Sequence, residues 1–296
     1  MVAPAFDYVA AGSYDEAVRL LAAAEGDREA KVLAGGQSLM PMLNLRLARP
    51  DLLIDINQAD QRPPSVADGV LRLPALTRHR VLLEHDLVRR RSPLLACAIR
   101  YVGNVRVRNR GTIGGSLAHA DPTSEIGCCA LALSASVVAR GPAGERTLPV
   151  SELFDTYWTT TLDPAEIITD VLIPAARPRQ GWSFQEMVRR TSDFAIVAVA
   201  ALVELDEAAN TIAAARVALA GVADRVTLAD PDLLAGLAGG QANRNGDVDA
   251  AAAAIAGRLE PATDVHASGE YRRRLARVLV ARALREARAR ATGEAA

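Results

Sequence analysis

Two short stretches of glycine and hydroxyl residues are the parts of this sequence best suited to chemistry. The first reads Val32-Leu33-Ala34-Gly35-Gly36-Gln37-Ser38-Leu39, an apolar run that ends abruptly in two glycines. The second, about 75 residues later, reads Gly111-Thr112-Ile113-Gly114-Gly115-Ser116. Glycine lets the backbone approach a ligand closely, and clustered backbone N–H groups form concave anion sites. The pair predicts two walls around one phosphorylated cofactor.

Each stretch alone is ambiguous, because Gly-Gly after a strand is most often a simple turn. Neither stretch has the G-x-G-x-x-G spacing of a Rossmann turn, and the chain has no Gly-Lys-Ser/Thr phosphate loop. A Rossmann-type nicotinamide domain and nucleotide hydrolysis are therefore disfavoured. We expect successive N–H groups, together with the hydroxyls of Ser38, Thr112 and Ser116, to bind a pyrophosphate, because hydrogen bonds to a charged acceptor are stronger than neutral ones.

Composition and charge exclude several classes of protein. The 296 residues are 50% hydrophobic, which is enough for two or three cores and predicts a multidomain globular protein. The formal net charge is −1, so no general attraction to nucleic acid or anionic membranes is expected. No uncharged apolar stretch is long enough to span a membrane, and the start of the chain does not resemble a signal peptide. A cytoplasmic location is expected.

Metal chemistry on this chain is not indicated. The three cysteines, Cys97, Cys128 and Cys129, lack the four-thiolate spacing of an iron–sulfur cluster, and the four histidines are scattered. Buried free thiols are expected for the adjacent pair, which lies in an Ala/Leu-rich run. His119 follows the second glycine stretch. We interpret it as a hydrogen-bonding loop residue, with a catalytic role as the alternative.

The glycine stretches need a framework of helices and strands to position them. Ser13 is expected to cap a helix that ends at Ala24, with Glu16 completing a capping box. Residues 175–181 are a linker by composition, and residues 241–246 a polar loop. Strands are expected at Lys31–Leu33, Asp51–Ile56, Gly69–Leu73, Ala75–Thr77, Ser136–Arg140, Ile167–Ile173, Ser183–Arg189, Ala195–Leu205 and Ile212–Leu219. Further helices are expected at Arg78–Leu83, Leu94–Val102, Glu125–Leu133, Asp249–Arg258 and Gly269–Ala291.

These elements predict an α+β protein in three parts. Residues 1–58 carry the first glycine stretch, residues 59–176 carry the second, and residues 177–296 form a smaller C-terminal α+β domain. The final helix places Leu275 and Leu279 on one face and arginines elsewhere. A solvated basic face is the expected role of these arginines, and contact with a partner is the alternative.

With their flanking residues, the two stretches resemble the FAD-binding medium subunit of the molybdenum hydroxylases, the family of xanthine dehydrogenase and aerobic carbon monoxide dehydrogenase. The resemblance covers nearly the whole chain in the expected order. It implies a two-subdomain flavin-binding domain of the PCMH type, followed by the C-terminal domain. The residues that carry it are Ala34–Leu39, Pro41, Leu45-Arg46, Gly111–Ser116, Ala118–Pro122, Arg189-Arg190, Asp193–Ala195, Tyr271-Arg272 and Arg282–Leu284.

The resemblance also implies which residues hold a noncovalent FAD. Two glycine stretches would wrap the pyrophosphate, and Glu125 would hold the ribityl or ribose side. Glu125 also stands at a predicted helix start, where an acid is favourable in any case. The implied cofactor-binding residues are Val32, Leu33, Ala34, Gly35, Gly36, Gln37, Ser38, Leu39, Val102, Thr112, Ile113, Gly114, Gly115, Ser116, Glu125, Ile168 and Phe194, with no catalytic residue and no metal ligand.

The three implied residues that lie outside the glycine stretches and are apolar have an equally good structural role. Val102 and Ile168 would contact the cofactor, but both suit a core. Phe194 would lie against the flavin ring, and it suits a core as well. One position departs from the family pattern: where members commonly have a lysine before the arginine pair, this chain has Gln185-Glu186. A cation near the flavin stabilises its reduced, anionic form. Without the lysine, another group must balance that negative charge, and Arg189 is a candidate.

The resemblance implies an electron-transfer subunit of a heteromeric molybdenum hydroxylase. Its partners would be a small chain with [2Fe–2S] clusters and a large molybdopterin chain, in a dimer of heterotrimers. Electrons would pass from the clusters to FAD and then to NAD, a quinone or oxygen. A free-standing FAD-dependent oxidoreductase with its own small substrate is the alternative, and a binding or assembly protein that uses the fold without flavin is a third possibility.

Overall fold

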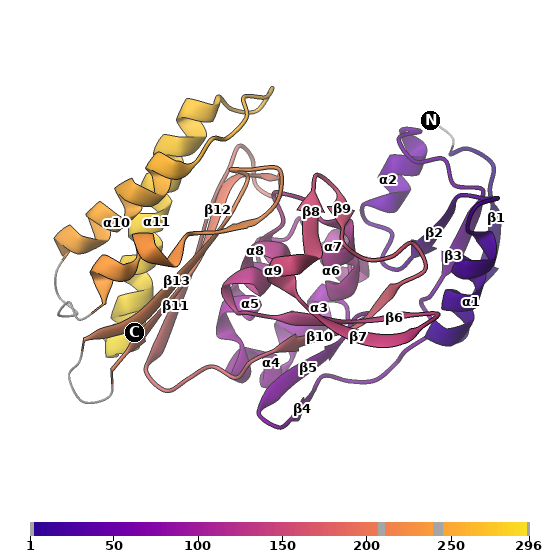
Figure 1. Ribbon diagram of the computed structural model, residues 1–296, viewed down its shortest axis with the longest axis horizontal. Coiled ribbons are helices and arrows are strands. Elements are labelled where there is room, and N and C mark those ends of the chain that lie inside the picture. The colour runs from indigo at the N-terminus through magenta and orange to yellow at the C-terminus, as the bar shows by residue number, and fades with distance from the viewer. Residues whose placement is uncertain (1–2, 207–210, 239–244, 295–296) are drawn as a thin grey trace.

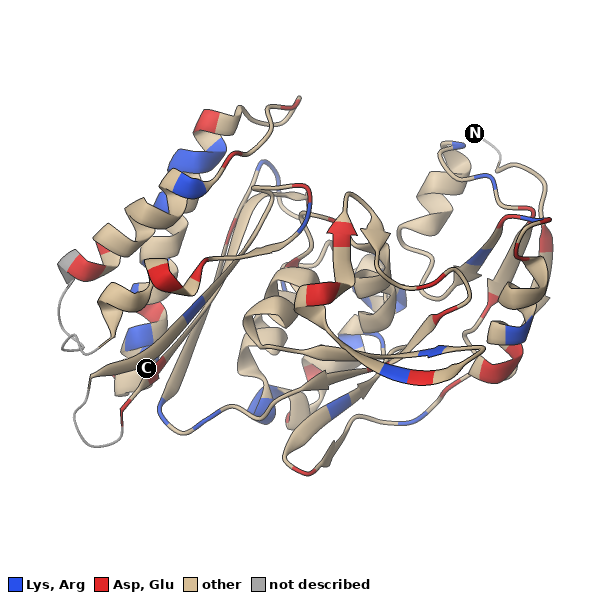
Figure 2. Cartoon of the chain, in the orientation of Figure 1, with Lys and Arg blue, Asp and Glu red and all other residues tan. Residues whose placement is uncertain are grey.

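The computed structural model describes residues 3–206, 211–238 and 245–294. Within them, three larger sheets follow one another along the chain, and helices separate and cover them (Figure 1). Figure 2 shows acidic and basic residues interspersed over all three parts, as expected from the net charge of −1. The fold is the α+β arrangement expected from the sequence. The proposed divisions after residues 58 and 176 fall in the connections between sheets.

The first sheet is parallel and carries the first glycine stretch at its carboxyl edge. Its strand order is β1-β3-β2. The buried side chains of α1 recur at helical spacing and pack on this sheet, and Ser13 caps α1 by accepting a hydrogen bond from the Glu16 N–H at 3.2 Å. Its elements are β1 (Asp7–Ala10), α1 (Tyr14–Ala24), β2 (Ala30–Leu33), α2 (Leu39–Asn44) and β3 (Leu52–Asp55).

The second sheet is antiparallel, in the order β4-β5-β10-β6-β7, and a group of short helices covers it. Its strands are β4 (Ser65–Ala67), β5 (Val70–Pro74), β6 (Ser136–Gly141), β7 (Gly144–Pro149) and β10 (Ile167–Ile173). The helices are α3 (His79–Glu84), α4 (Asp86–Arg91), α5 (Pro93–Ile99), α6 (Val105–Arg110), α7 (Ile113–His119), α8 (Glu125–Ala132) and α9 (Val150–Leu153). Strands β8 (Phe154–Thr156) and β9 (Thr159–Thr160) pair as a small antiparallel hairpin.

The third sheet, β11-β12-β13-β14, lies between two layers of helices (Figure 1). Side chains alternate across β12: Ala198 and Ala200 face the helices of the second part, whereas Val197 and Val199 face α10 and α11. The small alanines let α8 pack closely. The elements are β11 (Gln180–Val188), β12 (Ala195–Leu205), β13 (Ile212–Ala220), β14 (Thr227–Leu228), the 3₁₀ turns η1 (Pro231–Leu233) and η2 (Ala235–Leu237), α10 (Asn245–Arg258) and α11 (Gly269–Thr292).

Several expected elements differ from those in the structure. Ala75–Thr77 is a turn and not a strand, because the Ala75 carbonyl accepts a hydrogen bond from Gly114 and the Thr77 carbonyl accepts one from Ile113. The expected linker ends early, since β11 begins at Gln180. The final helices begin at Asn245 and Gly269, so the expected polar loop is helical at its end and residues 241–244 lie outside the described part.

Candidate cofactor site

The two glycine stretches meet in the folded chain. We call Ala34–Ser38 the first glycine turn and Gly111–Ser116 the second glycine turn. A Cβ atom on Gly35 would lie 2.5 Å from the Arg110 carbonyl oxygen and 2.8 Å from Gly111 Cα. Such distances are far below van der Waals contact, so only glycine fits where the two backbones touch. The turns are neighbouring walls, as their residue types indicated.

The first glycine turn presents unpaired backbone donors. In the described residues, the backbone N–H groups of Gly35, Gly36, Gln37 and Ser38 donate no hydrogen bond. Gly36 has a φ of 70°, the left-handed region that favours glycine. The hydroxyl of Ser38 makes no capping bond to α2. A run of successive free N–H groups that includes a left-handed residue can form a nest, a concave site that binds an anion.

The second glycine turn differs from the sequence expectation, which gave it a second set of free N–H groups. Most of its N–H groups are used within the protein: Ile113 and Gly114 donate to the turn after β5, and Gly115 donates to the Thr112 hydroxyl at 3.1 Å. Residues Thr112 to Gly114 are buried, whereas Gly115 and Ser116 are half-buried. The expected loop is in fact the first turns of α7, capped by Thr112. The second glycine turn therefore supports the first turn and contributes few free N–H groups to the site.

Two side chains that the sequence interpretation missed join the turns. Asn57 donates to the Ala34 carbonyl at 2.9 Å, and Arg78 donates to Asn57 Oδ1 at 2.5 Å. Arg78 also donates to the Arg110 carbonyl. Asn57 could have been found, because it follows β3 and the carboxyl ends of parallel strands share one edge. Arg78 had no such signal, since its role depends on the packing of the second part on the first.

His79 is a further residue that the sequence interpretation missed. Its side chain is 2% exposed and lies under the second glycine turn, with Nε2 3.1 Å from Ser116 Oγ. Burial lowers the pKa of His79 to about 4, so the ring is neutral at physiological pH. The neutral imidazole of His79 thus positions the hydroxyl of Ser116, which was expected to face the cofactor.

Glu125 is the first residue of α8, as expected, and it is only partly exposed. Burial raises the pKa of Glu125 to about 7. Glu186 lies across from it on β11, opposite Ala198, with Oε1 buried and without a hydrogen-bond partner in the described residues. Burial and the charge of Glu125 raise the pKa of Glu186 to about 8. The region where the family commonly has a lysine thus carries an acid that holds its proton at neutral pH.

The remaining expected site residues lie in different surroundings. Val102 and Ile168 are 8% and 4% exposed and belong to the main core. Phe194 is 71% exposed, in the connection between β11 and β12, so it is not a core residue. His119 lies at the end of α7, where burial lowers its pKa and Asp121 opposes the shift. Arg189 is exposed in the same connection as Phe194.

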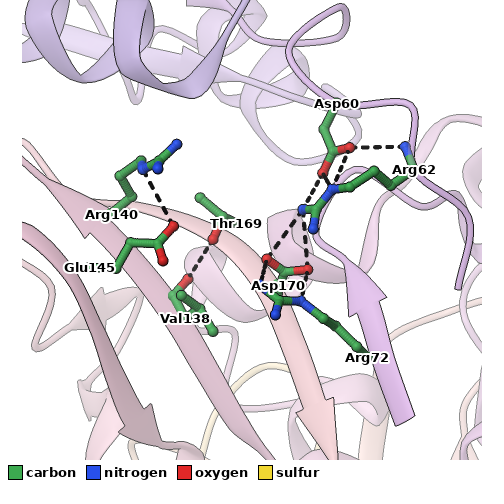
Figure 3. Close-up of polar contacts among 8 residues, drawn as sticks. All are labelled: Asp60, Arg62, Arg72, Val138, Arg140, Glu145, Thr169 and Asp170. Carbon is green, nitrogen blue, oxygen red and sulfur yellow. Dashed lines mark hydrogen bonds and ion pairs between the residues drawn. The ribbon is translucent and has the colours of Figure 1, made fainter. Parts of the chain in front are cut away.

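A hollow of about 440 Å³ lies away from the glycine turns, between α1 and the second sheet. Figure 3 shows its polar contacts: Arg72 and Arg62 both bind Asp170, at 2.8 and 3.2 Å, and Arg62 also binds Asp60 at 2.7 Å. The cations are already paired with carboxylates. This hollow is therefore a polar seam between the first two parts, with no unpaired charge left for a ligand.

The described residues contain no cluster of His, Cys, Asp and Glu that could hold a metal ion. Cys128 and Cys129 are buried free thiols, as expected. None of the helices in the described ranges is both long and apolar enough to cross a membrane.

Comparison with known proteins decides the family. Residues 4–176 match the FAD binding domain in molybdopterin dehydrogenase, and residues 182–287 match the CO dehydrogenase flavoprotein C-terminal domain. The chain belongs to the FAD-binding medium-subunit family of the molybdenum hydroxylases. It therefore contains an FAD-binding domain and is similar to subunits of oxidoreductase complexes.

The family relatives cover the chain from end to end. The chain is 39% identical to the 6-hydroxypseudooxynicotine dehydrogenase complex subunit alpha of Paenarthrobacter nicotinovorans, over 99% of both chains. It is 36% identical to the carbon monoxide dehydrogenase medium chain of Hydrogenophaga pseudoflava, over 98% of this chain and 99% of that one. These medium subunits differ in the named reactions of their complexes, so membership of the family does not name a substrate.

Solved structures of the family share the whole fold. Carbon monoxide dehydrogenase from Hydrogenophaga pseudoflava aligns with a TM-score of 0.93 at 36% identity, over 98% of this chain and 99% of that one. Quinoline 2-oxidoreductase from Pseudomonas putida 86 aligns with a TM-score of 0.90 at 33% identity, over 98% and 99%. The PCMH-type domain with its C-terminal α+β domain is thus the architecture of the medium-subunit family.

Proposed function

We propose that this chain is the electron-transfer subunit of a heteromeric molybdenum hydroxylase and holds FAD noncovalently. One observation carries the cofactor assignment. Four successive N–H groups, from Gly35 to Ser38, have no acceptor in the described residues around them, and Gly35 lies where the second glycine turn touches the first. A doubly charged pyrophosphate supplies the acceptors that this nest lacks. Hydrogen bonds to such an acceptor are worth about 1.5–3 kcal/mol each.

The other proposed contacts follow from where the side chains lie. Ser38 has a free hydroxyl for the pyrophosphate, and Ser116 presents a hydroxyl supported by His79. Glu125 would hold the ribityl or ribose hydroxyls. Bound FAD would supply a redox centre that takes electrons one at a time and passes them on in pairs. This chain would bind the cofactor, orient it and leave one edge open to partners.

The partners we propose are a small chain with [2Fe–2S] clusters and a large molybdopterin chain, in a dimer of heterotrimers. The support comes from relatives that are named as subunits or medium chains of dehydrogenase complexes. Substrate would be hydroxylated on the large chain, and electrons would reach this chain through the clusters. The reduced flavin would pass its electrons to NAD, a quinone or oxygen, and we propose the cytoplasm as the location of the complex.

Acid precipitation of the purified protein tests the cofactor assignment directly. The flavin should appear in the supernatant as FAD, in a one-to-one ratio with the chain. Recovery of FMN, of covalently bound flavin or of no flavin would contradict the proposal. Purification of a tagged chain expressed with its candidate partners tests the assembly. A chain that oxidises a small substrate without partners would favour a free-standing oxidoreductase instead.

A further inference from the structure

Arg78 is a cation at the junction of the two glycine turns, and the described residues give it no carboxylate partner. It lies just before α3 and is only partly exposed. Among the described residues, no carboxylate lies within ion-pair distance of its guanidinium, whereas Arg62 and Arg72 in the nearby seam are both paired. A partly buried, unpaired charge is unfavourable. A bound anion would offset the cost of placing this charge here.

The contacts of Arg78 place it against both turns. One nitrogen donates to the Arg110 carbonyl, directly before the second glycine turn, and the other donates to Asn57 Oδ1 at 2.5 Å. Asn57 in turn donates to the Ala34 carbonyl at 2.9 Å, in the first glycine turn. A guanidinium has five N–H donors. Within the described part of the chain, these two bonds leave the other N–H donors of Arg78 without a partner at the junction of the two turns.

The local charge is also unbalanced. Arg110 and Asp55 are the charged groups close enough to Arg78 to affect it. Burial lowers the pKa of Arg78, Arg110 lowers it further, and Asp55 opposes the shift, although the group remains charged at any physiological pH. Two cations and one carboxylate leave one net positive charge at the junction. A dianion placed on the adjacent nest would compensate it.

We infer that Arg78 is a cofactor-binding residue that supplies the counter-charge to the FAD pyrophosphate and, through Asn57 and the Arg110 carbonyl, holds the two glycine turns together. This inference rests on the proposed function. It adds a side-chain contribution to a site that otherwise depends on backbone N–H groups. Arg78 does not belong to either glycine stretch, so the residue pattern that predicted the site did not include it.

Titration of the FAD-free protein with FAD tests the inference. Arg78→Gln should weaken FAD binding about 10- to 100-fold, the loss expected for one charge-assisted hydrogen bond. Arg78→Lys keeps the charge but not the planar fork, and it should recover part of the affinity. Arg80→Gln is the matched control: Arg80 is two residues away, exposed and paired with Glu84 at 3.5 Å. It should change FAD affinity less than about twofold.

Two further measurements separate charge from folding. FAD affinity should fall with added salt in the wild type and in Arg78→Lys, and less steeply in Arg78→Gln, because one ionic contact is missing. Riboflavin, which has no phosphate, should bind the wild type and Arg78→Gln equally. Thermal unfolding of the FAD-free variants reports any loss of fold.

The outcomes are distinct. Wild-type protein that binds no FAD would overturn the proposed function. Wild-type protein that binds FAD, with Arg78→Gln binding it equally and with the same salt dependence, would overturn the role of Arg78 alone. Equal weakening of FAD and riboflavin would also count against it, since the effect would then not concern phosphate.

Discussion

Gly36 is the residue whose backbone most directly shapes the nest. Its φ of 70° is one that a β-branched residue adopts only with strain of about 1–2 kcal/mol. We predict that Gly36→Val weakens FAD binding about 10-fold or more while the chain still folds. Gly26→Val is the control, because Gly26 has a φ of 89°, lies outside the site and has nothing within 4 Å of an added Cβ. Equal flavin content in both variants would count against the nest.

Gly115 acts for a different reason from Gly36. It lies in α7 without a positive φ, so backbone strain is not the obstacle to substitution. A Cβ there would come within 2.7 Å of the Thr112 hydroxyl, which caps the helix, and 3.8 Å from Ala34 Cβ in the first glycine turn. Gly115→Val should therefore exclude FAD by displacing the Thr112 cap and filling the gap between the turns. Normal flavin content with an unchanged melting temperature would refute this.

Glu186 makes the stability of the protein depend on pH, because its side chain holds its proton up to about pH 8. Its folded pKa of about 8 lies above that of an unfolded glutamate, so its contribution to stability is complete below the unfolded pKa of about 4.3, falls as pH rises, and is lost by about pH 8. Glu186→Gln keeps the shape of the protonated acid. It should stabilise the protein at pH 9 relative to pH 6 by on the order of 1–2 kcal/mol. Thermal unfolding at both pH values measures this, with the exposed Glu152→Gln as control. An identical shift in the control would refute the prediction.

Asp170 on β10 binds Arg72 on β5 and Arg62 in the connection between the first and second sheets. These ion pairs join the connection to the second sheet. Asp170 is 1% exposed and binds Arg72 and Arg62. Removing its charge leaves Arg72 without a carboxylate partner, whereas Arg62 keeps Asp60, and because both arginine side chains are partly exposed the expected cost is about 1–3 kcal/mol. We predict a loss of that size for Asp170→Asn in denaturant unfolding. Asp86→Asn is the control, because its pair with Arg89 on α4 is exposed and worth about 0–1 kcal/mol.

The ion pairs of Asp170 also make the stability of the protein fall at acid pH. Burial tends to raise the pKa of Asp170, but the hydrogen bonds from Arg72 and Arg62 outweigh it and hold the pKa below its usual range. Its contribution is therefore complete above the unfolded pKa and is lost as pH falls below about 4. The wild type should lose more stability than Asp170→Asn between pH 5 and pH 3. Parallel losses would show that the seam is not the acid-sensitive element.

At the scale of the whole molecule, Phe194 is an exposed aromatic side chain on a connection of the third sheet. Phe194 is 71% exposed on the connection that enters β12, and β12 pairs with β13, whose end contacts Pro122 just before α8. Phe194 is our candidate for covering the flavin edge that faces a partner. Phe194→Ala should change the rate of flavin reoxidation by several-fold while FAD affinity stays within about twofold. A larger change in affinity than in reoxidation would assign Phe194 to cofactor binding.

Division of labour is the corresponding prediction for the assembly. The isolated chain should lack hydroxylase activity but keep a flavin that dithionite reduces. Substrate should reduce that flavin only after the iron–sulfur and molybdenum chains are added. Substrate oxidation by the isolated chain at the rate of a full complex would reverse the electron-transfer assignment.

Local patterns were enough to predict much of this protein. The cap at Ser13, the apolar β12 run and the paired glycines have properties that depend mainly on near neighbours, so the elements, the α+β class and the family followed from residue types and their order. The glycines also predicted that the two turns face each other, because small residues permit backbones to touch.

Tertiary structure decided which groups remain free to act. Whether an N–H donor is available depends on partners far along the chain: Ala75 and Thr77 accept hydrogen bonds from the second glycine turn, whereas nothing in the described residues accepts from the first. The same holds for Arg78, which reaches a site built by segments 21 and 32 residues away. Glu186 likewise keeps its proton because the packing of two domains buries it. Burial and pairing are properties of the assembled chain, and no local pattern of residues contains them.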